Sequence, residues 1–401
     1  METAHPAARP VVRLKPAAEA RAIRHGFPWV YDNEVVLDRR TRAIGPGALA
    51  RLEDGERQPL ATVAVSPGSR IFARVLDRDP DAAIDAAWIE TRLRAALAGR
   101  ERLFDAPFYR LIHAEADGLP GVVIDRFGDT AVLQPNTAWA EANLDPLVGA
   151  LRAATGVANV VKNAGGRSRK LEGLSDVTEV VAGAIPGPVP VPMNGATYLA
   201  DLLGGQKTGL FYDQRPNHAF AARLAGGGRV LDVFTHVGGF ALAALAAGAA
   251  EALAIDASAP ALDLARAGAE ASGVAGRLTL ERADAFAALE RLGAERRRFD
   301  LVVCDPPAFA PAKQALEAGL RAYERLARLA APLVEPGGYL VLCSCSHAVD
   351  LRTFRAASAR GIGKAGRRAV IVHTGFAGPD HPVLPQLAEG GYLKALFFRL
   401  G

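Results

Sequence analysis

Two reactive side chains stand where apolar runs in the second half of the chain come to an end. Asp305 opens the turn Asp305-Pro-Pro-Ala-Phe309, and Cys345 follows the run Tyr339–Ser344. Two consecutive prolines force an extended turn, so the Asp305 carboxyl and the proline carbonyls are expected to face a ligand crevice. A thiol can act as a nucleophile when its pKa is lowered. The plainer interpretations are an ordinary strand-ending turn and a small buried cysteine.

A glycine bend follows an earlier apolar run, Arg229–Phe234. Asp232 lies near the end of that run, and Gly238 and Gly239 open the helix expected next. Glycines at this point let a ligand approach the backbone. The spacing is not Gly-x-Gly-x-x-Gly, the dinucleotide fingerprint, so the glycine pair alone is weak evidence.

Two more acidic residues follow expected strands. Asp256 stands about 20 residues past the glycine bend, where a carboxylate can accept both hydroxyls of a ribose. This spacing fits nicotinamide and S-adenosylmethionine cofactors alike. A helix N-cap is the competing interpretation, and Ser258 competes for that role. Asp284, followed by Ala285, could flank an adenine ring or cap the next helix.

The polar run Asp213-Gln214-Arg215 precedes all of these motifs. We expect it to close over a charged cofactor, and a capped helix start is the alternative. Gly204–Thr208 superficially resembles a phosphate-binding loop. That motif requires Gly directly before Lys, and Gln206 occupies this position, so we reject it.

The elements expected to position these residues alternate between strand and helix. Such alternation predicts a mostly parallel sheet with helices on both faces, and its ligands lie outside the carboxyl ends of the strands. The last strand closely follows Gly390-Gly391 without a crossover helix, so we expect it to be antiparallel to the sixth. The expected strands are Arg229–Phe234, Ala252–Asp256, Leu278–Glu281, Phe299–Cys304, Tyr339–Ser344, Ala369–Thr374 and Ala395–Leu400. The expected helices are Phe240–Ala247, Ala259–Ser272, Ala285–Leu292 and Leu316–Leu333.

The first half of the chain has a different pattern. Short strand-like runs with Gly/Pro turns occupy Val11–Val75, which predicts a small β-rich module. A helix over Ile84–Phe104, a hairpin around Asp125–Asp129 and a helix over Leu144–Ala154 follow. Four prolines in seven residues from Pro186 indicate a domain boundary. We therefore predict domains at residues 1–76, 77–185 and 186–401.

Composition narrows the class of protein. The net charge is +4, and the first 75 residues hold 12 Lys and Arg against 8 Asp and Glu. A basic N-terminal module suits a phosphate-rich partner, although arginine abundance can also reflect genomic base composition. Three cysteines predict neither a disulfide framework nor a metal site. We find no signal peptide or apolar membrane span, so a cytoplasmic protein is expected.

Taken together, the motifs resemble those of the ribosomal RNA large subunit methyltransferase I family. The resemblance covers nearly the whole chain. It implies an α/β fold, with a C-terminal Rossmann-like class I methyltransferase domain of seven mostly parallel strands. A small β-rich PUA-like domain and a central α+β domain precede it. The matching segments are His25–Tyr31, Ser66–Arg74, Tyr109–Gly128, Gly205–Arg215, Asp232–Phe240, Phe299–Phe309, Ser344–Ser346 and Asp380–Val383.

The resemblance implies that the protein uses S-adenosylmethionine to methylate carbon 5 of a cytosine in 23S ribosomal RNA. A thiolate adding to C6 turns C5 into an enamine-like carbon that can attack the sulfonium methyl. By similarity Cys345 is the nucleophile, and Asp305 stabilises the ring near N3 as a protonated acid. The target base must be unpaired or flipped out of its duplex. A homodimer is also suggested.

The resemblance extends to the residues that bind the cofactor and the RNA. Phe309 offers a face on which a base could stack. The cofactor residues are predicted to be Asp232, Phe234, Gly238, Gly239, Asp256, Ala257, Asp284, Ala285, Asp305, Gln214 and Arg215. The RNA contacts are predicted to be Pro306, Pro307, Phe309, Lys207, Arg13, Lys15 and Arg24.

Three other functions remain to be weighed. An Asp-Pro-Pro-x-Phe turn also suits methylation of an exocyclic amine of adenine or guanine, which needs no thiol. A nucleotide-dependent oxidoreductase is disfavoured by the missing fingerprint and by the proline turn. A non-catalytic RNA-binding assembly factor is disfavoured because acidic and glycine positions stand at every expected strand end.

Overall fold

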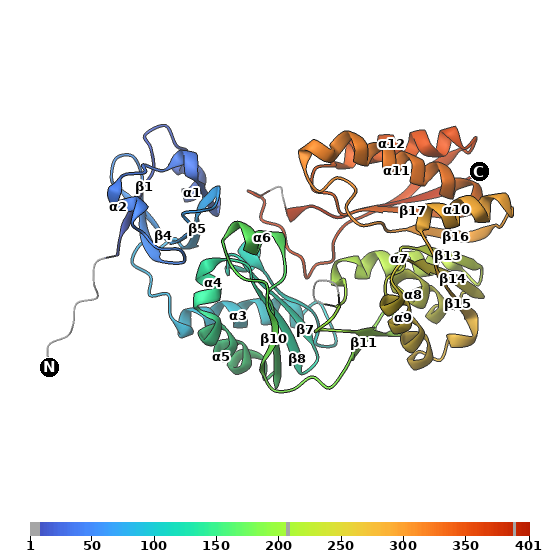
Figure 1. Cartoon of the computed structure of the whole chain (residues 1–401), viewed down its shortest axis with the longest axis horizontal. Coiled ribbons are helices and arrows are strands. Elements are labelled where there is room, and N and C mark those ends of the chain that lie inside the picture. Colours follow the sequence, from blue (N-terminus) through green and yellow to red (C-terminus); the bar gives the residue numbers. More distant parts are fainter. Residues whose placement is uncertain (1–8, 206–208, 388–389) are drawn as a thin grey trace. The chain divides into compact units, whose positions relative to one another are not determined.

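The computed structural model describes residues 9–205, 209–387 and 390–401. Two compact units share the described chain (Figure 1). One unit holds the described residues up to Pro186 and the segment that begins at Pro382. The other runs from Gly187 to His381 and includes residues 390–401. The boundary at Pro186 coincides with the start of the proline-rich segment.

The N-terminal part of the first unit is built on a five-stranded sheet in the order β1-β3-β4-β5-β2. Alternating burial along β3 shows one face packed on a core and the other facing solvent. Asp38 caps the short helix α2 by accepting a hydrogen bond from the Thr41 backbone N–H. The elements are β1 (Val11–Arg13), α1 (Ala20–Arg24), β2 (Trp29–Tyr31), η1 (Asp32–Glu34), α2 (Arg39–Arg42), β3 (Leu49–Glu53), β4 (Pro59–Val65) and β5 (Ile71–Asp77).

A second five-stranded sheet, in the order β10-β9-β8-β7-β6, follows in the same unit. Asp85 caps the long helix α3, and the Trp88 and Trp139 rings pack edge to face at 6.1 Å between centroids. The predicted hairpin is present as β7 and β8. The elements are α3 (Ala86–Glu101), β6 (Phe108–His113), η2 (Ala114–Asp117), β7 (Val122–Phe127), β8 (Thr130–Pro135), α4 (Ala138–Ala142), α5 (Leu144–Thr155), β9 (Asn159–Asn163), α6 (Arg167–Leu171) and β10 (Thr178–Ala182).

The second unit begins with a two-stranded hairpin of β11 (Val189–Met193) and β12 (Ala196–Ala200). Pro190 and Pro192 lie in β11, which a strand with a single neighbour tolerates because its other edge needs no N–H donors. The turn η3 (Tyr212–Gln214) then leads into α7 (Arg215–Ala225), with Pro216 in the first turn of the helix. Asp213, Gln214 and Arg215 therefore lie at the start of a helix, which was the alternative interpretation of this run.

A seven-stranded sheet in the order β15-β14-β13-β16-β17-β19-β18 forms the rest of the unit. The first five strands in this order are mutually parallel. β19 is antiparallel to both β17 and β18, which confirms the predicted reversal. The strands are β13 (Arg229–Val233), β14 (Glu251–Asp256), β15 (Leu278–Arg282), β16 (Phe299–Cys304), β17 (Val334–Ser344), β18 (Ala369–Gly375) and β19 (Lys394–Leu400).

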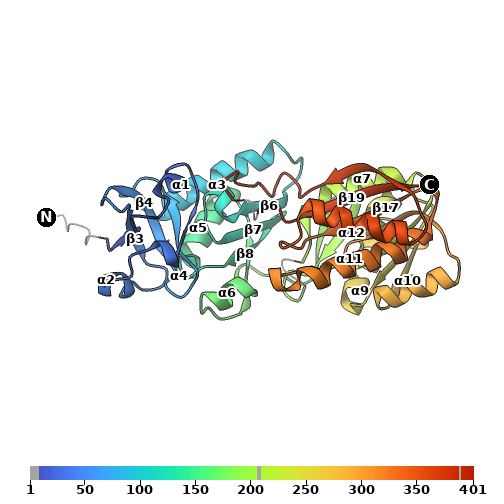
Figure 2. The ribbon, with the colours of Figure 1, turned by 90° about the horizontal axis from the view of Figure 1, so that it is seen from above.

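Helices cover both faces of this sheet, as the alternating pattern predicts (Figures 1 and 2). Helices α10, α11 and α12 pack together along one face, and α7, α8 and α9 along the other. The central strands are apolar and buried on both sides, as a covered parallel sheet requires. The helices are α8 (Gly239–Ala246), α9 (Ala259–Ala271), α10 (Ala285–Ala294), α11 (Leu316–Ala330) and α12 (Leu351–Lys364), with short turns η4 (Ala275–Arg277), η5 (Lys313–Ala315) and η6 (Ala331–Leu333).

In the described part of the chain, no helix combines the length and the apolar character needed to cross a membrane.

Candidate active site at the strand ends

The end of β13 carries a buried carboxylate. Asp232 is fully buried, and its Oδ2 accepts hydrogen bonds from Thr235 Oγ1 at 2.6 Å and from the Ala241 backbone N–H at 2.9 Å. Burial raises its pKa to about 6. Among the described residues, Oδ1 has no hydrogen-bond partner. A buried acceptor without a donor is costly, and a bound cofactor offering a donor or a positive charge would satisfy it.

The loop after β13 has an unusual backbone. Phe234, His236 and Gly238 all have positive φ, at 65°, 53° and 87°. Residues with side chains rarely adopt this region, and such strain gathers at ligand sites. The His236 backbone N–H donates to Asp256 Oδ2 at 2.9 Å, so the loop is tied to the end of β14.

The two glycines of this loop also have packing reasons to lack side chains. A Cβ on Gly238 would lie 2.8 Å from the Leu242 Cγ, and one on Gly239 would lie 2.8 Å from His218 Nε2. Burial lowers the pKa of His218 to about 3, so that ring is neutral. Their predicted contact with a cofactor stays a prediction, because protein packing alone explains why the side chains are missing.

Asp256 is not the N-cap of α9. Ser258 takes that role by accepting from the Ala261 backbone N–H, and Asp256 is half-buried at the end of β14. The Asp256 carboxylate accepts from the backbone N–H groups of His236 and Ser258. Ala257 follows it and is exposed. A half-buried carboxylate fixed by two backbone donors can still accept hydroxyl groups from a ribose.

Asp284 is a helix N-cap, the alternative role that its sequence context suggested. Its side chain caps α10 by accepting from the Ala287 backbone N–H at 2.9 Å, and the residue is exposed. Ala285 is buried in the first turn of the same helix. The cap gives Asp284 a structural function of its own, so its contact with a cofactor stays a prediction.

Asp305 follows β16 directly and is held by an oriented amide. Gln214 Nε2 donates to Asp305 Oδ2 at 2.9 Å. Gln214 is buried, and its Oε1 accepts from Asn217 Nδ2 at 2.7 Å, which fixes which end of the amide faces Asp305. The sequence suggested Gln214 as a cofactor residue. Its position beside the proline turn adds a second function, which is to hold the carboxylate as an acceptor.

Arg215, the next residue of the same run, is largely buried at the start of α7. Burial lowers its pKa, whereas the nearby Asp380 raises it. Its guanidinium carbon lies 5.1 Å from the centre of the Tyr212 ring. Its predicted contact with the cofactor stays a prediction.

Cys345 lies just past the end of β17. Cys304 and Cys343 are fully buried inside their strands, whereas Cys345 is half-buried. Because β16 and β17 are parallel, with Cys304 opposite Leu342, Asp305 and Cys345 lie at the same edge of the sheet. Burial raises the pKa of the Cys304 and Cys343 thiols, so neither can supply a thiolate.

The turn after Asp305 is packed against aromatic rings. Pro306 is buried and Pro307 is exposed. The Phe309 ring lies 4.9 Å from the Tyr323 ring and 6.1 Å from the Phe286 ring, between centroids. Phe309 is half-buried, so part of its surface contributes to the core rather than to a stacking face.

The sequence interpretation missed a polar group beside Cys345. The Tyr323 hydroxyl is hydrogen-bonded to Ser344 Oγ and to Ser346 Oγ, at 2.9 Å each. Ser346 Oγ in turn accepts from the Ala310 backbone N–H at 3.0 Å. These bonds tie the residues on either side of Cys345 to α11 and to the turn that follows Asp305. Serine and tyrosine are common in any core, so the sequence contains no signal for this network.

The predicted RNA contacts of the N-terminal domain already have protein partners. Arg13 pairs with Glu53 at 3.2 Å, and Arg24 pairs with Asp54. Lys15 Nζ donates to the backbone carbonyl of Asn33 at 2.9 Å. Lys207, the remaining predicted contact, lies outside the described residues.

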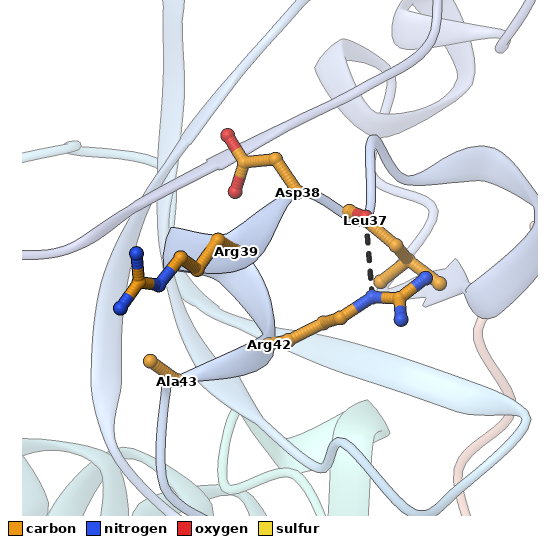
Figure 3. Close-up of a pocket in the computed structure, with 5 residues that line it drawn as sticks. All are labelled: Leu37, Asp38, Arg39, Arg42 and Ala43. Atoms are coloured by element: carbon orange, nitrogen blue, oxygen red, sulfur yellow. Dashed lines mark hydrogen bonds between the residues drawn. The ribbon is translucent and has the colours of Figure 1, made fainter.

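A second basic group in this domain was not among the predicted contacts. Arg39, Arg40 and Arg42 lie on α2 and are all exposed. A hollow of about 460 Å³ is lined by Arg39, Arg42 and their neighbours Leu37, Asp38 and Ala43. Figure 3 shows the Arg42 side chain reaching back to the Leu37 carbonyl. In the described part of the chain no hydrogen bond or ion pair engages the Arg39 and Arg40 guanidiniums. Asp38 uses its carboxylate to cap the helix.

Two protein families match parts of the chain. Residues 177–399 match the S-adenosylmethionine-dependent methyltransferase family, and residues 12–78 match the PUA-like domain. Among solved structures, a candidate S-adenosylmethionine-dependent methyltransferase from Streptococcus mutans has a TM-score of 0.81 at 19% identity, covering 97% of this chain and 99% of that one. That likeness shows the fold.

Curated relatives match along almost the whole chain. Ribosomal RNA large subunit methyltransferase I of Erwinia tasmaniensis is 36% identical over 385 residues, covering 95% of this chain and 97% of the relative. The protein of the same name from Shewanella denitrificans is 36% identical over 396 residues, covering 97% and 99%. With a methyltransferase domain whose strand ends carry this site, the chain belongs to the ribosomal RNA large subunit methyltransferase I family of S-adenosylmethionine-dependent enzymes.

Proposed function

We propose that this enzyme forms 5-methylcytosine in 23S ribosomal RNA, with Cys345 as the nucleophile. One observation carries the cytosine-C5 chemistry. The half-buried Cys345 lies at the same sheet edge as Asp305, while the two other thiols are sealed inside their strands. Methylation of an amine would need no thiol there. The names of the curated relatives support the ribosomal RNA substrate.

The residues at the ends of β13 and β14 fit S-adenosylmethionine. Asp232 has a buried oxygen in need of a donor, and Asp256 has a carboxylate fixed by backbone N–H groups. When bound, the cofactor supplies an electrophilic methyl group on a sulfonium. The carboxylate of Asp232 would favour its positive charge, and Asp256 would accept the ribose hydroxyls.

Cys345 would attack C6 of the target cytosine. Bond formation between Sγ and C6 pushes electrons onto C5, which then becomes the nucleophile for the methyl group. A base then takes the C5 proton, and the electrons of the C5–H bond re-form the C5–C6 double bond as the C6–Sγ bond breaks and the thiolate leaves. The Tyr323, Ser344 and Ser346 hydroxyls hold the turn that carries the thiol, so they would fix the direction of attack.

Asp305 would bind the polar edge of the same base. Gln214 donates to Oδ2, so this oxygen of Asp305 acts as a hydrogen-bond acceptor. The protonated acid near N3 expected from the sequence stays a prediction, and we propose in addition that an oxygen of Asp305 accepts from the exocyclic N4 amine. That contact would select cytosine over uracil, which carries a carbonyl at this position.

Arg39, Arg40 and Arg42 of α2 would supply phosphate contacts in the N-terminal domain. Arginine side chains that are exposed and not paired with carboxylates neutralise phosphates at low desolvation cost. Such contacts position RNA without reading its sequence. The choice of nucleotide would then rest with the residues at the strand ends.

The test compares Cys345→Ala with a control, Cys343→Ala, which removes a thiol group from a buried position. Each variant is incubated with 23S ribosomal RNA from a strain lacking the protein, and methyl groups are mapped by mass spectrometry. We expect Cys345→Ala to lose at least about 10³-fold in turnover, as removal of a covalent nucleophile does. Cys343→Ala should keep turnover within about tenfold, provided that it remains folded.

The acceptor role of Asp305 also favours a second candidate function, methylation of an exocyclic amine. A carboxylate held by Gln214 suits an amine N–H of adenine or guanine equally well. In that case Cys345→Ala would retain turnover, and the mapped methyl group would lie on a nitrogen. Either result would contradict the cytosine-C5 proposal.

A further inference from the structure

A buried lysine lies beside the turn that carries Cys345. Lys394 is the first residue of β19 and is 4% exposed. Its Nζ donates to the backbone carbonyls of Ser346 at 2.9 Å and of Val349 at 2.6 Å. Within the described part of the chain, no carboxylate forms an ion pair with it. The two carbonyls belong to the segment that directly follows the thiol.

Strand register places the base of this lysine next to Cys345. Lys394 pairs with Ser344 across the β17–β19 ladder, and its ammonium reaches the carbonyl of Ser346. Its backbone and its charged end therefore contact the residues immediately before and after Cys345. Burial lowers the pKa of Lys394, and negative charge at Cys345 and at Asp350 opposes that lowering.

A buried ammonium without an ion pair is costly to a fold. An apolar residue would suit the start of a buried strand better, unless the charge serves a purpose. Two neutral carbonyls satisfy two of the three N–H groups, and Asp350 acts on the charge electrostatically without forming an ion pair. A thiolate at Cys345 would add a second, more strongly coupled negative charge to balance it.

We propose that Lys394 is a positioning residue whose buried positive charge favours the thiolate of Cys345. The lysine does not touch the substrate in this proposal. It acts through the turn 346–349 and through its field, which is little screened because the group is buried. The loss of the thiol proton to solvent is therefore favoured before RNA arrives. That the enzyme needs a thiolate rests on the proposed function. The effect of Lys394 on the Cys345 thiol does not depend on that function.

Other groups around Cys345 shift its balance between thiol and thiolate in different directions. Asp305 from the end of β16 and Asp350 from the start of α12 carry negative charge and disfavour a thiolate. Tyr323 from α11 is neutral, because burial raises its pKa. His347, two residues along, is exposed and adds charge only when protonated. Lys394 from β19 is thus the buried cation of this group of described residues.

The experiment measures how fast iodoacetamide alkylates Cys345 in the folded protein between pH 5 and 10. The pH range spans the ordinary thiol value of about 8.5. Mass spectrometry of the Cys345 peptide gives the rate, and the buried Cys304 and Cys343 serve as internal references. Neither RNA nor cofactor is present, so a negative result here is separate from failure of the methylation proposal.

Lys394→Gln is the informative variant because an amide keeps two N–H donors for the carbonyls but carries no charge. We expect its alkylation profile to move up by about 1 pH unit or more, the usual effect of losing a nearby opposite charge. Lys394→Arg keeps the charge and should leave the profile near that of the wild type. If Lys394 has only a structural role, Lys394→Arg should change the alkylation profile more than Lys394→Gln does.

The proposal is overturned if the Lys394→Gln and wild-type profiles coincide. If Lys394→Gln does not fold, the pH profile of Cys345 alkylation in the wild type still tests the proposal. Its midpoint must lie below the ordinary thiol value of about 8.5, and a midpoint at or above that value overturns the proposal without any variant.

Discussion

Charged side chains are used in opposite ways by the N-terminal domain and by the strand ends of the methyltransferase domain. The arginines of α2 are exposed, and among the described residues no hydrogen bond or salt bridge engages the guanidiniums of Arg39 and Arg40, although Arg40 acts electrostatically on Asp38. Asp232 and Lys394 are buried and are held by short hydrogen bonds. The surface group acts by summed long-range attraction, whereas the buried groups act at fixed positions on single atoms.

This difference predicts how each region responds to substitution. Removing one buried charge leaves its partners unsatisfied and changes the chemistry at a defined atom, so the effects are large. Removing one surface charge takes away only one of several contributions to the attraction for RNA, so the loss of affinity is small and depends on salt.

Among the charged side chains, the largest effect is expected from Asp305→Asn. The amide keeps the shape of the side chain but presents a donor where the proposed base offers one. We expect methyl transfer to fall by about 10²–10³-fold, as for other groups that stabilise charge in a transition state. Thermal stabilisation by S-adenosylhomocysteine should persist. Asp263→Asn, on the exposed face of α9, is the control and should behave as wild type. A rate within threefold of wild type for Asp305→Asn would exclude this contact.

A smaller effect is expected from pH at Asp232. Its pKa in the folded protein, about 6, lies above the ordinary value of 3.8, so the folded protein binds a proton as pH falls from 7 to 4. If the carboxylate holds the cofactor, affinity for S-adenosylmethionine should fall by up to about tenfold per pH unit below 6. Calorimetric titration of wild type and Asp232→Asn measures this.

The same proton has the opposite effect on stability. Burial penalises the ionised form, so this group destabilises the fold most above pH 6 and progressively less as pH falls toward 3.8. Asp232→Asn should bind cofactor weakly and without this pH dependence. An identical slope for variant and wild type would assign the pH effect to another group.

A still smaller effect is expected from the α2 arginines. Replacing Arg39, Arg40 and Arg42 by alanine removes three phosphate contacts, so the slope of log affinity against log salt should become shallower by about 2 for single-stranded RNA. Turnover at saturating RNA should not change. Filter binding at several salt concentrations gives the slope. An unchanged slope would mean that RNA does not use this surface.

The smallest effect is expected from Arg13→Ala. The Arg13–Glu53 pair is partly exposed, so its loss should change unfolding free energy by no more than about 1 kcal/mol. Because Glu53 already partners this arginine, the salt slope should change by less than 1. Chemical denaturation and filter binding check both. A change as large as that of the α2 variant would restore Arg13 as a main RNA contact.

Much of the methyltransferase sheet could be predicted because hydrophobic runs and turn residues carry local information. All seven strands were expected, most of them within one or two residues of their bounds. β17 begins earlier than predicted, at Val334, because Val334 pairs with Phe299 before the Gly337-Gly338 irregularity. Helix α12 was missed because its buried face includes a serine and a glycine, Ser358 and Gly361, among the apolar residues.

The site was less predictable where its residues depend on strand order. Asp305 and Cys345 follow apolar runs and could be read from the sequence. Lys394 could not, because a lysine at a strand start normally faces solvent. Only the position of β19 between two other strands buries it. The pairing of Gln214 with Asp305 joins residues 91 positions apart and has no local signal.

The insertion of β19 between β17 and β18 also bears on how the protein is made. β18 leaves the ribosome first, yet in the finished sheet it pairs with β19. A nascent chain therefore carries β18, with exposed Val370, Ile371 and Val372, before its neighbour exists. Chaperones would meet this apolar edge during that interval. Because Lys394 opens β19, the surroundings of the thiol are completed by the same late step.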